Sequence, residues 1–277
     1  MPRPLVMGVV NVTPDSFSDG GRYVEPRAAV AHGLALVERG ADLLDVGGES
    51  TRPGATRPLV AEELARVVPV ITELVAAGAT VSVDTMRAEV AAAALEAGAS
   101  IVNDVSGGLA DPDMLPLVAS SAATYVAMHW RAHADRMSAH TDYSAHGGVV
   151  PGVVVELRQR VEAALAAGIA ADRLVLDPGL GFAKTAEQSW ELLRGLSALD
   201  SLGHRLLVGA SRKSFLGRLL ADAAGEPRPV EGREAAHLAV VLHCARAGVW
   251  GVRVHDVGSA CDALSAWEAL EEGGARG

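Results

Sequence analysis

Cysteine is almost missing from this chain. Its 277 residues include only Cys244 and Cys261, which are far apart and form no Cys-x-x-Cys pair. Small secreted domains use dense cysteine frameworks, and structural zinc sites use closely spaced cysteine pairs. We therefore expect neither a disulfide framework nor a zinc site, and the simpler expectation is a reducing compartment.

Positive charge is also scarce. Lys and Arg together number 24 against 34 Asp and Glu, which gives a formal net charge of −10. Proteins that coat nucleic acids or anionic membranes need clustered positive charge, so we expect neither partner. An anion that binds this protein must be held in a local pocket.

Long apolar runs are missing as well. No stretch approaches the roughly 18 to 20 uninterrupted apolar residues of a membrane span. The first ten residues, MPRPLVMGVV, contain prolines where a signal peptide would have a long apolar core. We expect a cytoplasmic protein.

Lysine is the rarest basic residue. Only Lys184 and Lys213 are lysines, and the other 22 basic residues are arginines. An ammonium is a compact point charge, whereas a guanidinium is a planar fork. Retention of Lys213 among so many arginines therefore hints at a function that arginine does not serve. For Lys184 the sequence leaves function and chance open.

Short apolar runs, in contrast, recur along the whole chain. Eight of them read as buried strands, and segments with helical spacing lie between them. The runs cover residues 5–12, 41–48, 80–85, 100–107, 124–130, 174–181, 206–211 and 251–257. Nearly continuous apolar strands joined by helices indicate a parallel sheet covered on both faces. Eight such units in this length predict an α/β fold, a (β/α)₈ TIM barrel forming a single domain over residues 1–277.

Glycines mark the expected helix ends. Helical spacing covers residues 28–39, 62–77, 88–97, 153–167 and 234–247, and a glycine follows each before the next strand. Such a glycine is the usual C-terminal cap. Three segments, 13–26, 49–60 and 131–148, are predicted as long loops, the first two able to close over a ligand. The histidines of the third, His133, His140 and His146, match no metal-ligand spacing.

Polar residues gather where the predicted strands end, which is where barrels of this kind carry their chemistry. The set comprises Asn11, Asp45, Asp84, Asn103, Asp104, His129, Asp177, Ser211, Arg212, Lys213, Arg253 and His255. Any one of the acidic residues could simply cap a helix. Together they predict a cavity for a ligand rich in hydrogen-bond donors.

The residue types divide this predicted rim into two sides. Asp84, Asn103 and Asp177 suit a flat heterocycle with amino and ring N–H groups. Arg52, Arg253 and His255 suit a phosphate or pyrophosphate, and the Asn11 carboxamide can contribute an oxygen to Mg²⁺.

Two other motifs fail on inspection. Gly179 and Gly181 begin a G-x-G-x-x-G pattern, but Lys184 occupies the third glycine position, so a dinucleotide fingerprint is not expected. Ser211 has no evident base partner in the sequence, which argues against a serine hydrolase.

Seven segments in series resemble one family. They are VMGVVNVTPDSFSDGG, GADLLDVGGESTRPGA, SVDT, NDVSGG, LDPGLGFAK, VGASRKSFLG and RVHDV. From about residue 6 to residue 257 the chain resembles the dihydropteroate synthases, pterin-binding (β/α)₈ enzymes of folate biosynthesis. The resemblance implies condensation of 6-hydroxymethyl-7,8-dihydropterin pyrophosphate with p-aminobenzoate to give 7,8-dihydropteroate and pyrophosphate, by an S_N1-like mechanism.

The resemblance also implies roles for individual residues. Pterin binding is implied for Asp84, Asn103, Met128, Asp177, Gly209 and Lys213, and pyrophosphate binding for Asn11, Thr51, Arg52, Arg253 and His255. Binding of p-aminobenzoate is implied for Phe17, Thr51, Pro53, Phe182, Lys213 and Ser214. Of these, Asp84, Asp177, Lys213, Arg253 and His255 are the implied catalytic residues, and Asn11 is the implied Mg²⁺ ligand.

The same resemblance implies sulfonamides as inhibitors and a homodimer formed through late helices. Two alternatives stay open at this point. One is a pterin-binding methyltransferase domain, which has no need of a pyrophosphate site, and the other is a homologue that binds pterin without catalysis.

Overall fold

The computed structural model describes residues 2–12, 24–49, 58–133 and 136–274. Eight parallel strands close into one barrel in the order of the sequence. They are β1 (Leu5–Asn11), β2 (Leu43–Gly47), β3 (Val81–Asp84), β4 (Ile101–Asp104), β5 (Thr124–Met128), β6 (Leu174–Asp177), β7 (Arg205–Gly209) and β8 (Gly251–Val254). The predicted TIM barrel is confirmed.

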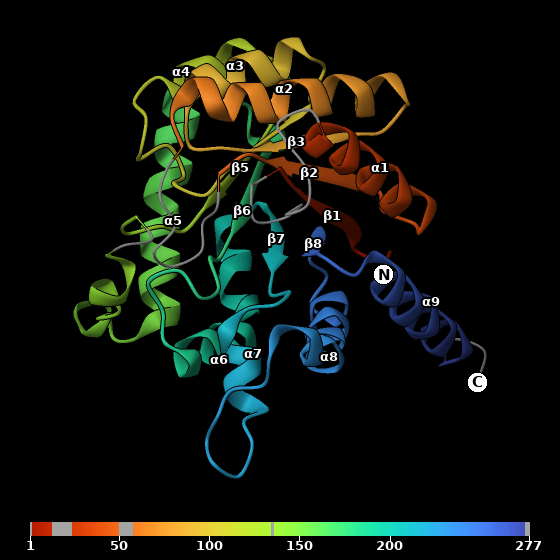
Figure 1. Cartoon of the computed structure of the whole chain (residues 1–277). Coiled ribbons are helices and arrows are strands. Elements are labelled where there is room, and N and C mark those ends of the chain that lie inside the picture. Colours follow the sequence, from red (N-terminus) through yellow and green to blue (C-terminus); the bar gives the residue numbers. More distant parts are fainter. Residues whose placement is uncertain (1, 13–23, 50–57, 134–135, 275–277) are drawn as a thin grey trace.

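Helices surround the barrel (Figure 1). In the described part of the chain they are α1 (Val24–Glu38), α2 (Val60–Ala76), α3 (Ala88–Glu96), α4 (Met114–Ser120), α5 (Val149–Ala166), α6 (Ala186–Arg194), α7 (Ser214–Leu219), α8 (Glu234–Arg246) and α9 (Val257–Gly274). Within it no helix combines the length and the apolar character needed to cross a bilayer.

The connection between β7 and β8 departs from the simple alternation of strand and helix. It holds two helices, the six-residue α7 and then α8. Gly225, Pro227 and Pro229 lie between them, and such residues do not continue a helix. The short α7 begins directly after Lys213, so its first turn fixes the backbone at the end of the loop that follows β7.

Glycines end the helices where the sequence predicts. Gly40, Gly78, Gly98, Gly168 and Gly248 all have positive φ, between 70° and 103°. At Gly40 this left-handed backbone, which costs glycine little, directs the chain from α1 into β2.

Alternation along the strands separates two apolar layers. Side chains that point outward pack under the helices. Those that point inward fill the lower barrel as one cluster: Met7, Leu43, Ile101, Val126, Val175 and Leu207. Two residues further along β2, β4 and β8 the inward positions become Asp45, Asn103 and Arg253, next to the C-terminal mouth of the barrel. The barrel is thus apolar at its floor and charged at its mouth.

Candidate active site

A guanidinium bridges two carboxylates at the mouth of the barrel. Arg253, on β8, donates from Nε to Oδ2 of Asp45 at 2.6 Å and from Nη2 to Oδ2 of Asp84 at 2.8 Å. Asn103 donates from Nδ2 to the same oxygen of Asp45 at 3.0 Å. Four strands therefore contribute to one hydrogen-bonded cluster.

This cluster lies largely out of solvent. Asp45 is fully buried, and its Oδ1 has no hydrogen-bond partner in the described part of the chain; the same is true of Oγ of Ser82, its register partner. Burial, opposed by Arg253 and reinforced by the charge of Asp45, raises the pKa of Asp84 to about 7. Asp84 therefore changes charge close to neutral pH.

Strand register aligns three of the predicted positions, Asn11, Asp84 and Asn103, by way of Gly47. Asn11 pairs with Gly47, Gly47 with Asp84, and Asp84 with Asn103. Gly47 has no side chain, so the space between Asn11 and Asp84 stays open at the mouth. The side chain of Asn11, at the end of β1, is partly exposed there.

A third carboxylate and an ammonium complete the mouth. Asp177 ends β6, is 6% exposed, and accepts a hydrogen bond on Oδ1 from the amide of Gly179 at 2.7 Å. Lys213 follows β7, and its Nζ donates to the carbonyl of Leu180. Burial, opposed by the charge of Asp177, lowers the pKa of Lys213 to about 8. Burial also raises the pKa of Asp177, and the charge of Lys213 opposes that rise.

Gly209 joins the two halves of the site. It is the register partner of Arg253, and a Cβ placed on it would lie 3.7 Å from Cβ of Arg253 and 4.0 Å from Oδ2 of Asp177. The predicted division into a heterocycle side and a phosphate side is therefore too sharp, because Arg253 is bonded to Asp84 and also borders the Asp177 half.

An apolar wall stands beside these charges. Met128, at the end of β5, packs with Met86 and Val105, and Phe182 and Trp130 lie against them. Nζ of Lys213 lies 4.9 Å from the centre of the Phe182 ring. A flat ring bound between this wall and the carboxylates would meet apolar contacts on one side and hydrogen-bond acceptors on the other.

Ser211 does have a histidine partner, so the sequence-based expectation that it lacks a base partner was wrong. Its Oγ lies 3.0 Å from Nδ1 of His255 and accepts a hydrogen bond from the His255 amide at 3.2 Å. The contact could not be read from the sequence, because 44 positions separate the two residues. Ser211 is 7% exposed, so it orients the His255 ring more readily than it reaches a substrate.

Asp104 does not belong to the mouth of the barrel. It points outward from β4 and accepts hydrogen bonds from Ser106, Gly108 and the hydroxyl of Tyr125. The alternation of the strand explains this, since only one of two successive side chains can face inward. Asp104 orders the loop after β4.

The remaining predicted residues fall into two groups. Ser214 begins α7 and is exposed. Phe17, Thr51, Arg52 and Pro53 lie outside the described residues.

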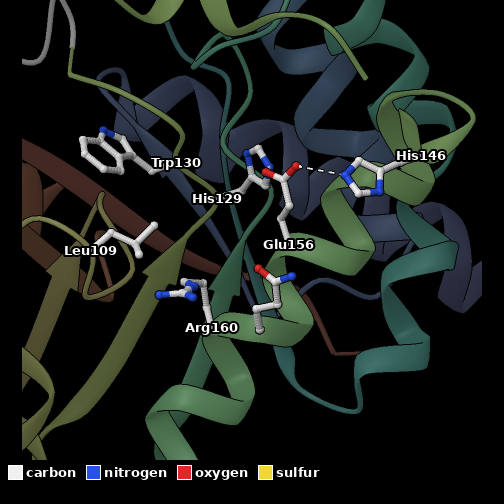
Figure 2. A pocket seen from close by; sticks show the side chains of 7 residues that line it. Leu109, His129, Trp130, His146, Glu156 and Arg160 are labelled. Atoms are coloured by element: carbon white, nitrogen blue, oxygen red, sulfur yellow. Dashed lines mark hydrogen bonds and ion pairs between the residues drawn. The ribbon is translucent and has the colours of Figure 1, made fainter. Parts of the chain in front are cut away.

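A second polar cluster lies beyond the end of β5, and the sequence did not indicate it. Glu156 reaches from α5 to His129, with Oε2 2.9 Å from Nε2 of the ring (Figure 2). Arg131 also bonds Glu156, and His146 lies 3.6 Å from it. These groups border a cavity of about 340 Å³ lined by Leu109, His129, Trp130, His146, Glu156, Gln159 and Arg160. In the described residues no group of three or more His, Cys, Asp or Glu side chains could hold a metal ion, so the cluster is not a metal centre.

Comparison with known proteins adds independent findings. Residues 7–255 match the family model described as pterin binding enzyme. A protein named dihydropteroate synthase from Mycobacterium leprae is 56% identical over 261 residues, which cover 94% of this chain and 90% of that protein.

Solved structures agree. That of Xanthomonas albilineans dihydropteroate synthase with 4-aminobenzoic acid has a TM-score of 0.88 and 47% identity, and the match covers 97% of this chain and 93% of that one. That of Yersinia pestis dihydropteroate synthase in a sulfonamide drug complex has a TM-score of 0.88 and 37% identity, and covers 98% of this chain and 95% of that one.

Proposed function

The chain belongs to the pterin-binding enzyme family, and we propose that it is a transferase which condenses 6-hydroxymethyl-7,8-dihydropterin pyrophosphate with p-aminobenzoate. The products are 7,8-dihydropteroate, a precursor in folate biosynthesis, and pyrophosphate. The observation that carries this proposal is the convergence of Asp84, Asn103, Asp177 and Lys213 on one barrel mouth that Arg253 and Gly209 connect.

The pterin is bound by the strand-end side chains. Asp84, Asn103 and Asp177 offer acceptors for its amino and ring N–H groups, and the Asn103 and Lys213 side chains donate to its ring acceptors. The apolar wall at Met128 supports one face of the ring. These acceptors are buried, so a ligand that lacks the matching N–H groups would leave them without hydrogen bonds. The site therefore selects for a ring that carries those groups.

Catalysis follows from the charges beside the ring. The bond between the pterin methylene carbon and the pyrophosphate oxygen breaks, and its electron pair leaves with pyrophosphate. The cation that remains is delocalised over the ring, where the carboxylates of Asp84 and Asp177 stabilise it. The amine of p-aminobenzoate then forms the new carbon–nitrogen bond and loses a proton. No covalent intermediate with the enzyme is needed.

The leaving group is stabilised by Arg253 and His255, together with Asn11 at the end of β1 and with Thr51 and Arg52, for which the family resemblance implies this role. Asn11 fits a magnesium ion as a single carboxamide ligand at the open edge of the mouth, since Mg²⁺ commonly keeps several waters and takes its remaining ligands from substrate phosphates. Mg²⁺ bound there would supply positive charge to the departing pyrophosphate.

The second substrate lies next to Lys213. Phe182, Lys213 and Ser214 form the described part of its pocket, and the family resemblance implies further contacts from Phe17, Thr51 and Pro53, which lie outside the described residues. The nearness of Phe182 to the Lys213 ammonium supports this placement. Sulfonamides, which share the aromatic amine of p-aminobenzoate, compete for the same pocket.

The protein acts as a homodimer in the cytoplasm. Three exposed apolar side chains in the late part of the chain, Leu219, Val230 and Leu270, support association through this region. The two free thiols support a reducing compartment. Light scattering at about micromolar concentration tests the dimer.

One assay tests the reaction. Purified protein, dihydropterin pyrophosphate, p-aminobenzoate and Mg²⁺ should give equal amounts of pyrophosphate and dihydropteroate, and omission of p-aminobenzoate should stop dihydropteroate formation. Pterin binding without either product would identify a binding protein and defeat the proposal.

A further inference from the structure

Lys184 is buried inside a loop that no proposed substrate reaches. It is 8% exposed, and three acceptors surround its Nζ: Nδ1 of His129 at 2.9 Å, the carbonyl of Gly179 at 2.9 Å and the carbonyl of Phe182 at 3.0 Å. An ammonium has three hydrogens to donate, so every one of them is used inside the protein.

The loop that it holds has an unfavourable backbone. Gly179, Gly181 and Ala183 have φ of 67°, 75° and 48°. At Ala183 this left-handed conformation costs about 1 kcal/mol or more, because Cβ approaches the following carbonyl. Two side chains oppose this cost: Lys184 binds two carbonyls, and the hydroxyl of Tyr143 donates to the carbonyl of Ala183 at 3.1 Å.

The loop in turn sets both contacts of the Lys213 ammonium. The carbonyl of Leu180 accepts its hydrogen bond, and the ring of Phe182 lies beneath it. Leu180 and Phe182 lie within residues 179–184. We call this segment, which the Lys184 side chain holds, the strap. Movement of the strap would displace both residues.

His129 and Glu156 support the strap from outside. For Nδ1 of His129 to accept from Lys184, the proton of the neutral ring must lie on Nε2, which faces the Glu156 carboxylate at 2.9 Å. Burial and the charge of Lys184 lower the pKa of His129 to about 4, despite Glu156, and so keep the ring neutral. Figure 2 shows Glu156 between His129 and His146, at the wall of the cavity.

We propose that Lys184 is a positioning residue that fixes Phe182 and Lys213 for p-aminobenzoate, and that His129 and Glu156 hold its ammonium in place. The inference rests on the proposed function. The strap should affect the pterin site less than the p-aminobenzoate site, because Asp84 and Asn103 stand on β3 and β4, although Asp177 accepts a hydrogen bond from Gly179.

The first experiment separates the two substrates kinetically. In Lys184→Met the side chain stays unbranched, is shorter by one atom and loses all three hydrogen bonds. The KM for p-aminobenzoate should rise about tenfold or more, and the KM for dihydropterin pyrophosphate should rise by a smaller factor, because Lys213 also contacts the pterin whereas Asp84 and Asn103 keep their places on the strands. A p-aminobenzoate KM within about twofold of wild type would overturn the proposal.

The second experiment tests the outer support. Glu156→Ala removes the acceptor of the His129 Nε2 proton and should raise the p-aminobenzoate KM, whereas Glu156→Gln keeps an acceptor oxygen and should stay close to wild type. Arg160→Gln is the matched control, because Arg160 lines the same cavity without contacting the strap. Equal KM values in Glu156→Ala and Arg160→Gln would contradict the role of Glu156.

A readout without substrate completes the test. Nitrogen-15 NMR of the wild type should show His129 with its proton on Nε2, and Lys184→Met should raise the His129 pKa because the neighbouring positive charge is gone. If the wild type formed no dihydropteroate but the NMR result held, the proposed function would fail and the strap would stand. If the tautomer and the pKa of His129 were the same in Lys184→Met as in the wild type, Lys184 would not hold this loop, and the proposal would be overturned. Should Lys184→Met not fold, the same spectra of Glu156→Ala test whether Glu156 sets the His129 tautomer.

Discussion

Arg253 and Asp45 form the most deeply buried ion pair at the barrel mouth, with Nε of Arg253 2.6 Å from Oδ2 of a fully buried carboxylate. Asp84 pairs with the same guanidinium, but its side chain is 13% exposed. Arg253 is therefore held by one carboxylate that water does not reach, Asp45, and by one that is partly exposed to water, Asp84.

This asymmetry predicts different costs for two matched variants. Asp45→Ala should lower the free energy of unfolding by about 3 kcal/mol, since it leaves Arg253 without its buried partner. Asp84→Ala should lower it by about 1 kcal/mol or less, because water replaces part of the interaction. Urea unfolding of both variants measures the difference, and equal losses would contradict the assigned burial.

Activity should follow a narrow bell in pH. Asp84 must be ionised to stabilise the cation, and its pKa is raised to about 7, so kcat/KM should fall below that pH. Lys213 must be protonated to donate, and its pKa is lowered to about 8, so kcat/KM should fall above that pH. The raised pKa of Asp177 adds to the fall in kcat/KM at low pH. The apparent pKa values of the profile therefore describe the interacting groups together and not single residues. A flat profile from about pH 6 to about pH 9 would show that these groups do not govern turnover.

Gly209 should matter for the ligand more than for the fold. A Cβ at this position makes only ordinary contacts with the protein, so Gly209→Ala should change stability by less than about 1 kcal/mol. The added methyl nevertheless fills space between Arg253 and Asp177, and calorimetry should show pterin binding weakened about tenfold. Gly251→Ala is the control, because its Cβ would press on Leu207 in the barrel floor at 3.2 Å and should cost stability without affecting the pterin. Unchanged pterin affinity in Gly209→Ala would place the ring elsewhere.

Lys213→Arg tests why an ammonium is kept. Nζ fits between one carbonyl and one aromatic ring, and a planar guanidinium spreads its donors over a larger area. We expect kcat/KM to drop about tenfold or more, with the melting temperature nearly unchanged. Full activity in this variant would remove the meaning given to the scarcity of lysine, although the family assignment would stand.

Local patterns carried the prediction of the fold. Nearly continuous apolar runs, helical spacing and a glycine after each of five helices are properties of neighbouring residues, and the structure confirms the barrel and the glycine positions that they predict. The split of the last crossover into α7 and α8 was missed, because the count of strands and helices took the whole segment as one helical unit.

The meeting of polar side chains at the barrel mouth was predicted from the strand ends alone. Asp84, Asn103 and Asp177 meet at the mouth because all parallel strands end at the same rim. The contacts of Ser211 with His255, of Lys184 with His129 and of His129 with Glu156 join residues 27 to 55 positions apart. No local pattern encodes such pairs, since they depend on how the closed barrel brings its loops together.

The apolar floor of the barrel has a consequence for how substrates enter and products leave. Six side chains close the lower barrel beneath the charged mouth, so no passage leads through the sheet. Both reactants must enter, and both products must leave, by the same doorway.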